Sequence, residues 1–365
     1  MAASIYDFAP LSSGVGPGKS TSALARRDYG AALRKAQQAD FGGSRRSSAP
    51  RVGVIYNPRS HRNQGSDFDC GLCPDIHIAQ PAARAHLPRA LADFAARGID
   101  LLVINGGDGT VRDVLTCGHA VFGDNWPVLA VLPKGKTNAL ALDLGIPSEW
   151  TLQHAIAAYE KGVRARRQPL RVTALSSSAD ENTIGPVHGF ILGAGAFTTA
   201  TRAGQTAHRL GAFNGVAVAT TALWALAQSL FGTRQNPWRK GDRMQIRLGR
   251  QGAPMAHSGQ GDPQWRQVLF ASTLERLPAG INPFGLLRQG LRMIAVDQIS
   301  RRTTALVPAV LTGHLTRGLR ERGIHQLAAT QFTLELSDHF ILDGEAFAPG
   351  EYRIEQGAEL VFATP

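Results

Sequence analysis

The chain has 365 residues, of which 43% are hydrophobic, and its formal net charge is +11 at pH 7. This length fits about two soluble domains and a tail, while three cysteines without a signal-peptide pattern exclude a disulfide scaffold and favour a reducing compartment. The positive charge favours anionic partners, which include nucleotide phosphates, anionic lipids and nucleic acids.

The first part of the chain carries a basic arm and a pair of cysteines. Residues 1–49 are rich in serine, glycine and alanine and have a net charge of +4, which predicts a flexible arm. Within this arm, residues 20–38 have the composition of a short basic helix. Cys70 and Cys73 form a lone CxxC without nearby histidines, so we interpret them as incidental thiols rather than zinc ligands.

Residues 50–170 alternate between strand-like and helix-like patterns. Pro88 can open a helix that stops at Gly98, and Thr110 is expected to cap the following helix. The alternation predicts an α/β fold with a parallel sheet and with ligands at the carboxyl ends of its strands. The predicted strands are residues 52–56, 99–104 and 128–132.

A glycine-rich turn follows the second of these strands. Its residues are Gly106, Gly107, Asp108, Gly109 and Thr110. Glycines allow a ligand to approach bare backbone, and their N–H groups form an anion site together with the following helix N-terminus. The Asp108 carboxylate is placed to bind a metal ion or a nucleotide hydroxyl. The alternative is a tight turn that merely needs glycine, and the position at a strand end favours a ligand site.

A second turn of similar character follows the third strand, at residues 133–138. Gly135 permits a tight turn, Lys136 could reach a phosphate, and Asn138 could cap the next helix or hold the loop. An ordinary strand–helix turn is the alternative interpretation. Neither turn has the spacing of a Walker motif.

Beyond residue 170 the pattern predicts a largely β domain, with glycine and proline between strand-like runs. One segment, residues 210–233, contains no charged residue. Its glycine, alanine and threonine content favours a helix packed on this domain, or one lining a lipid pocket, over a membrane span. The predicted strands are residues 268–272, 292–296, 332–336 and 340–342.

Two acidic residues flank a glycine near the end of the chain, in Asp343-Gly344-Glu345. A carboxylate that follows a strand can act as a general base. An Asp-Gly pair is also the commonest signal of a tight hairpin turn. The residues alone leave both interpretations open.

Four motifs follow one another along the chain: Asn57-Pro58-Arg59-Ser60, the turn at 106–110, Pro133-x-Gly135-x-x-Asn138 and Asp343-Gly344-Glu345. In this order they resemble the diacylglycerol kinase catalytic family, which includes bacterial lipid kinases and sphingosine and ceramide kinases. The resemblance covers about residues 51–365. It implies an α/β nucleotide-binding domain, here placed at residues 50–170, and a β-sandwich-like lipid domain at residues 171–365 whose end is able to return to the first domain. It also implies ATP and a divalent metal, usually Mg²⁺.

The resemblance assigns roles to individual residues. Glu345 becomes the general base for a lipid hydroxyl, oriented by Asp343, and Asp108 is the third catalytic carboxylate. Ala139 stands where many members have an aspartate, and the family's Phe-x-Asn and Asn-Asp-Gly elements are replaced by residues 190–192 and 280–285, so the metal ligands stay unassigned. The predicted nucleotide-binding residues are Asn57, Ser60, Gly106, Gly107, Asp108, Gly109, Thr110, Gly135, Lys136 and Asn138.

The sequence thus predicts an ATP-dependent lipid kinase that phosphorylates a hydroxyl of diacylglycerol or of a sphingoid-type lipid. Its expected partners are the lipid and an anionic membrane surface, with a cytoplasmic location at the inner face of a membrane. The alternatives are an NAD kinase-like enzyme, which uses a similar Gly-Gly-Asp-Gly turn, and a nucleotide- or lipid-binding regulator without turnover. A nucleic-acid partner is not expected, because only the positive charge suggests one and no recognisable nucleic-acid-binding motif supports it. The acceptor lipid and the oligomeric state are left open.

Overall fold

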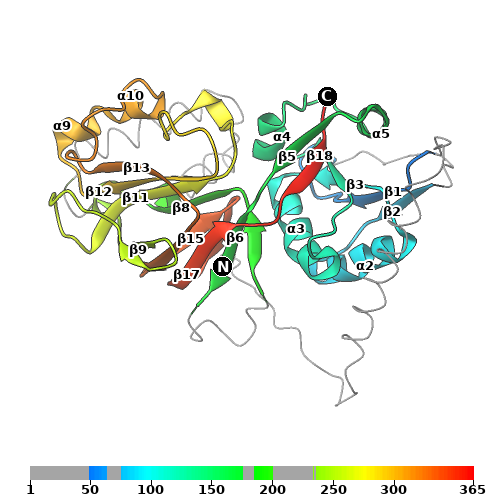
Figure 1. The fold of residues 1–365 in the computed structure, drawn as a ribbon, viewed down its shortest axis with the longest axis horizontal. Coiled ribbons are helices and arrows are strands. Elements are labelled where there is room, and N and C mark those ends of the chain that lie inside the picture. Colours follow the sequence, from blue (N-terminus) through cyan, green and yellow to red (C-terminus); the bar gives the residue numbers. More distant parts are fainter. Residues whose placement is uncertain (1–48, 64–74, 176–184, 200–232, 234–235) are drawn as a thin grey trace, which may run out of the picture. The chain divides into compact units, whose positions relative to one another are not determined.

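The computed structural model describes residues 49–63, 75–175, 185–199, 233 and 236–365. The described residues form a mixed, mostly parallel α/β domain and a large antiparallel β domain, as the sequence predicts (Figure 1). The basic arm at residues 1–48, Cys70, Cys73 and residues 210–232 lie outside the described residues. Within the described part of the chain, no helix combines the length and the apolar character that a membrane span requires.

The first domain is built on a sheet of six described strands in the order β2-β1-β3-β4-β18-β5. All neighbouring strands run parallel except β5, which is antiparallel to β18. Figure 1 shows α2 and α3 along one side of this sheet and α4 and α5 along the other. The strands are β1 Val52–Tyr56, β2 Ile76–Ala79, β3 Leu101–Gly106, β4 Val128–Pro133, β5 Arg164–Arg167 and β18 Leu360–Ala363. The helices are η1 Arg84–His86, α2 Leu87–Arg97, α3 Asp108–Phe122, α4 Ala139–Asp143 and α5 Leu152–Lys161.

Local sequence accounts for most of these elements. All residues of β1 and β3 are buried, as expected of short apolar runs in the middle of a parallel sheet. Helix α2 has proline in its first turn, buries Leu91 and Phe94 on one face, and ends where Gly98 adopts a φ of 60°. The expectation that Thr110 caps the next helix is wrong, because α3 begins two residues earlier with Gly107 as its N-cap.

The end of the chain completes the first domain. Strand β18 lies between β4 and β5, with Phe362 opposite Leu129 of β4. Phe362 is fully buried, so this terminal strand belongs to the core of the sheet. The first domain is therefore made from segments that lie far apart in the sequence.

The second domain is a single sheet of twelve described strands, all of them paired antiparallel. The sheet curls, so that strands from both halves contribute to one hydrophobic core. The strands are β6 Leu170–Ala174, β7 Val187–Gly189, β8 Ile191–Gly195, β9 Asp242–Leu248, β10 Ala253–Pro254, β11 Trp265–Ser272, β12 Leu291–Asp297, β13 Ile324–Ala329, β14 Gln331–Leu336, β15 Phe340–Leu342, β16 Glu345–Phe347 and β17 Gly350–Gln356. The short helices are α8 Pro237–Lys240, η2 Pro278–Gly280, α9 Arg301–Thr304 and α10 Val307–Leu311.

Candidate active site

The two glycine-containing turns lie against each other at the carboxyl ends of β3 and β4. The amide of Lys134 donates to the carbonyl oxygen of Gly106 at 3.0 Å. A Cβ on Gly107 would lie 2.8 Å from the Cα of Gly135, and a Cβ on Gly135 would lie 2.6 Å from the Cα of Gly107. Since a side chain at either position would collide with backbone, both positions require glycine.

Asn138 holds the second turn in shape. Its Oδ1 accepts from the amide of Gly135 at 2.7 Å, and its Nδ2 donates to the carbonyl oxygen of the same residue at 2.9 Å. Its backbone adopts a φ of 52°, and its side chain makes no capping hydrogen bond to α4. Of the two roles predicted for Asn138, holding the loop is therefore the one observed. Lys136 lies at the exposed tip of this turn.

The turn after β1 is joined to the turn after β3 by side-chain hydrogen bonds. Asn57 donates from Nδ2 to the Oγ1 of Thr110 at 2.8 Å, and its backbone amide donates to the carbonyl oxygen of Asn105 at 3.0 Å. Buried Asn63, which the sequence did not single out, donates from Nδ2 to Asn57 O and to Asn105 Oδ1, both at 2.8 Å. Ser60 is buried in the same turn, where its amide donates to Asn57 O at 3.1 Å.

Gly109 lies beside open space and is not packed against other described residues. A Cβ built on it would have no heavy atom within 4 Å. Packing within the described protein therefore does not require glycine at this position, unlike Gly107. A bare backbone beside open space, in the first turn of α3, is suited to the close approach of a phosphate.

Asp108 links the first turn to the helix that follows the second. Its Oδ1 accepts from the amide of Leu140, in the first turn of α4, at 3.4 Å. The carboxylate thus supplies a cap to α4 that Asn138 does not. Burial raises the pKa of Asp108 above its ordinary value, although hydrogen bonds from the backbone of Ala139 and Leu140 oppose the shift.

Asp343 and Gly344 form a two-residue hairpin turn. Leu342 at the end of β15 pairs with Glu345 at the start of β16, and the two turn residues have φ values of 46° and 84°. Positive φ at both positions is typical of a type I′ turn, for which Asp-Gly is a favoured sequence. The interpretation of this motif as a hairpin turn is confirmed.

The Asp343 carboxylate faces the backbone between β7 and β8. Its Oδ2 accepts from the amide of Phe190 and its Oδ1 from the amide of Ile191, both at 2.9 Å. Burial, together with the nearby charge of Asp108, raises the pKa of Asp343 to about 7. The charge of Asp108, in the first domain, thus opposes the ionisation of Asp343 in the second domain.

Arg112 joins α3 to the hairpin and was not predicted from the sequence. Its buried guanidinium forms an ion pair with Glu345 and donates to Asp113 Oδ1 at 3.0 Å and to Leu342 O at 3.4 Å. Arg112 follows Asp108 by four residues, so both side chains lie on one face of α3. This spacing is the only sequence signal that could have suggested it. The Glu345 side chain is half-buried and is held in this ion pair.

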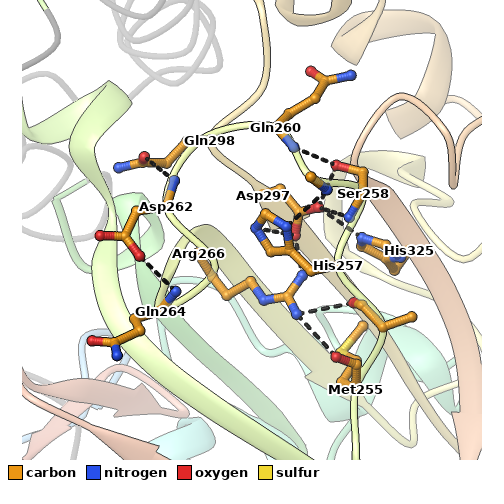
Figure 2. Close-up of polar contacts among 12 residues, drawn as sticks. Met255, His257, Ser258, Gln260, Asp262, Gln264, Arg266, Asp297, Gln298 and His325 are labelled. Atoms are coloured by element: carbon orange, nitrogen blue, oxygen red, sulfur yellow. Dashed lines mark hydrogen bonds and ion pairs between the residues drawn. The ribbon is translucent and has the colours of Figure 1, made fainter.

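A second polar cluster lies inside the antiparallel domain. Figure 2 shows Asp297 at its centre, with His257, Ser258, Arg266 and His325 around it. Asp297 forms an ion pair with Arg266 and accepts from Ser258 Oγ at 2.7 Å and from the Ser258 amide at 2.9 Å. It also contacts Nε2 of His325 at 3.0 Å and Nε2 of His257 at 3.7 Å. Burial alone would raise its pKa, but hydrogen bonds from His325 and Ser258 lower it to about 2. Both carboxylate oxygens are engaged within the protein, which indicates a structural network.

Comparison with known protein families and sequences places the first domain. Residues 51–172 match the family model described as the diacylglycerol kinase catalytic domain. The chain is 35% identical over 112 residues to a diacylglycerol kinase of Bacillus subtilis (strain 168), which is 29% of this chain and 36% of that protein. It is 30% identical over 98 residues to a probable lipid kinase YegS-like of Citrobacter koseri, covering 26% and 33% of the two chains. The chain thus spans about a third of the length of these curated relatives.

Comparison with solved structures extends the likeness to both domains. The crystal structure of a diacylglycerol kinase from Bacillus anthracis str. Sterne has a TM-score of 0.52, with 17% identity, over 87% of this chain and 97% of that one. A second structure from the same organism gives a TM-score of 0.57 with 16% identity, over 87% and 98% of the two chains. At this identity the likeness concerns the fold.

Proposed function

We propose that this chain, whose residues 51–172 belong to the diacylglycerol kinase catalytic domain family, is an ATP-dependent lipid kinase. In this proposal it transfers the terminal phosphate of ATP to a lipid hydroxyl. The observation that carries the proposal is the contact between α3, whose first residue is Asp108 of the glycine turn, and the hairpin that contains Asp343. Arg112 of α3 makes this contact, since it pairs with Glu345 and donates to Leu342 O. A phosphate site and a proton acceptor are the two elements that phosphoryl transfer to an alcohol requires.

The nucleotide phosphates would lie beside the turn at 106–110. Kinases of this family use ATP, and the open space at Gly109 supports the approach of a phosphate to the backbone. The N-terminus of α3 adds a partial positive charge there. Lys136, at the exposed tip of the neighbouring turn, would contribute a full positive charge. Asn57, Ser60, Gly135 and Asn138 would act by holding the three turns in register.

The Asp108 carboxylate would suit a magnesium ion that is held mainly by the nucleotide phosphates and water. Among the residues that the structure describes, no group of three or more acidic, histidine or cysteine side chains is arranged to hold a metal. Mg²⁺ is commonly bound by one or two carboxylates together with substrate phosphates and water. Asp108 would be its protein ligand, and the ion would neutralise charge on the phosphates.

We assign the proton acceptor to Asp343 in preference to Glu345. One carboxylate oxygen of Glu345 is engaged by the Arg112 guanidinium, which favours a role in positioning the hairpin. The pKa of Asp343, raised to about 7, suits a group that accepts a proton near neutral pH. Each of its oxygens receives one backbone hydrogen bond, which leaves a lone pair for a substrate hydroxyl.

The acceptor would be a diacylglycerol or a sphingoid-type lipid, presented at an anionic membrane surface on the cytoplasmic side. The test is incubation of the full chain with labelled ATP, Mg²⁺ and separate preparations of diacylglycerol, sphingosine and NAD. We expect label in a lipid product only. Label in NADP alone would replace the proposal with an NAD kinase. ATP binding without transfer to any acceptor would favour a regulator without turnover.

The activity should depend on pH through Asp343. A base must be unprotonated to act, so kcat/KM for ATP should rise with pH, along a limb with its midpoint near the pKa of about 7. The measurement is kcat/KM between pH 5.5 and 8.5 at constant ionic strength and saturating lipid. A profile that is flat over this range would contradict the assignment of Asp343.

A further inference from the structure

An exposed surface of leucines and arginines lies on the antiparallel domain, around the helices α9 and α10. Leu286 is 78% exposed and is the most exposed large apolar side chain of the described residues, and Leu311 is 37% exposed. Figure 1 shows α9 and α10, in orange, on the outer edge of this domain. We call this surface the α9–α10 face. Its exposed members are Leu286, Arg288, Arg301, Arg302, Leu311, Arg317, Arg320 and Arg322.

Contacts between segments hold the parts of the chain that carry these residues next to one another. The amide of Asn282 donates to Leu311 O at 2.6 Å, which joins the segment before Leu286 to the end of α10. A Cβ on Gly285 would lie 3.0 Å from Thr316 Cγ2, next to Arg317. The segment after α10 is fixed to the end of β12, where the amide of Asp297 donates to Gly323 O at 2.8 Å.

The distribution of charge along this surface is uneven. Residues 303–316 contain no aspartate, glutamate, lysine or arginine, and arginines stand on both sides of them. Between residues 286 and 322 the acidic residues are Asp297, which is buried against Arg266, and the exposed Glu321. An uncharged stretch with an exposed leucine and basic flanks fits a segment that lies in the interface of an anionic bilayer.

We propose that the α9–α10 face docks onto an anionic lipid bilayer. Leu286 and Leu311 enter the headgroup region, while the arginines around them bind anionic headgroups. Nucleic acid fits the surface less well, because its exposed apolar side chains are aliphatic and offer no platform for stacked bases. The inference rests on the proposed function only in that a lipid kinase must reach its acceptor at a membrane.

The test measures binding alone, so that its failure is distinguishable from a failure of the kinase proposal. The full chain, without ATP, is floated with vesicles of phosphatidylcholine and with vesicles that also contain phosphatidylglycerol. We expect binding only to the second kind. The triple variant R302E/R317E/R320E should bind them at least ~100-fold more weakly, since each basic residue near such a surface contributes about a factor of five and the added carboxylates are repelled.

A control variant removes the effect of net charge. Arg89, Arg97 and Lys161 are exposed on α2 and α5 of the first domain, so R89E/R97E/K161E changes the charge of the chain by the same amount. It should retain binding within ~5-fold, because charges far from the contact are screened by salt. Leu286→Ser, which leaves the charge unchanged, should weaken binding ~10-fold through lost apolar burial.

Three results would overturn the proposal. The first is an equal loss of binding in the two triple variants, which would indicate that net charge or another segment carries the interaction. The second is unchanged vesicle binding in R302E/R317E/R320E and in Leu286→Ser. The third is loss of binding to an RNA homopolymer in R302E/R317E/R320E while vesicle binding is kept, which would assign the face to nucleic acid.

Discussion

Asp343→Asn is expected to lower the rate of lipid phosphorylation by about 10³-fold, because general-base catalysis typically contributes 10²–10⁴-fold. An amide cannot accept the proton of the attacking hydroxyl. The Oδ1 of asparagine can still accept from the amide of Ile191, whereas its Nδ2 cannot accept from the amide of Phe190, so a modest loss of stability is expected as well. The measurement is kcat for lipid phosphate formation, beside ATP affinity and the melting temperature of the same preparation.

Glu345→Gln is the matched control for this prediction, because it removes the other carboxylate of the same hairpin. Arg112 then loses its ion pair but keeps its hydrogen bonds to Asp113 and Leu342. We expect a loss of at most about 10²-fold, as for a misplaced catalytic group, and a retained acidic limb in the pH profile. A nearly inactive Glu345→Gln beside a fully active Asp343→Asn would return the role of base to Glu345.

Asp108→Asn is expected to lower turnover by about 10²–10³-fold, the usual effect of removing one electrostatic contributor from a transition state. The fold should persist, because the Oδ1 of asparagine can still accept from the amide of Leu140 and cap α4. The measurement is kcat in a preparation whose circular dichroism spectrum matches that of the parent. Turnover close to the parent value would remove the turn after β3 from the proposed mechanism.

Asp108→Asn should also change the pH dependence of the activity, which a purely structural role of Asp108 would not do. The charge of Asp108 contributes to the raised pKa of Asp343. Without that charge, the carboxyl group of Asp343 should lose its proton at lower pH. The acidic limb of the residual activity in Asp108→Asn should therefore move below its position in the parent enzyme. An unmoved limb would show that the two carboxylates are not coupled.

Local sequence determined the central strands β1, β3 and β4 of the first domain and the point where α2 ends. Strand β1 is a continuous apolar run because it is buried on both faces. Helix α2 is followed by a glycine because the residue at that position, Gly98, has a left-handed conformation. The same holds for the hairpin at Asp343-Gly344, where two positive φ values select the residue types. These features depend on neighbours along the chain, and the sequence therefore reveals them.

Only the tertiary structure decided which side chains meet. The bond from Arg112 to Leu342 joins residues 230 positions apart, and nothing in either segment encodes its partner. The same is true of Asp108 as the cap of α4, and of β18 between β4 and β5. The proposal of Asp343 rather than Glu345 as base also depends on tertiary packing, because burial and the nearby charge of Asp108 raise the pKa of Asp343. Sequence pattern specifies which elements form, whereas the environment of a carboxylate depends on the packing of elements from both domains.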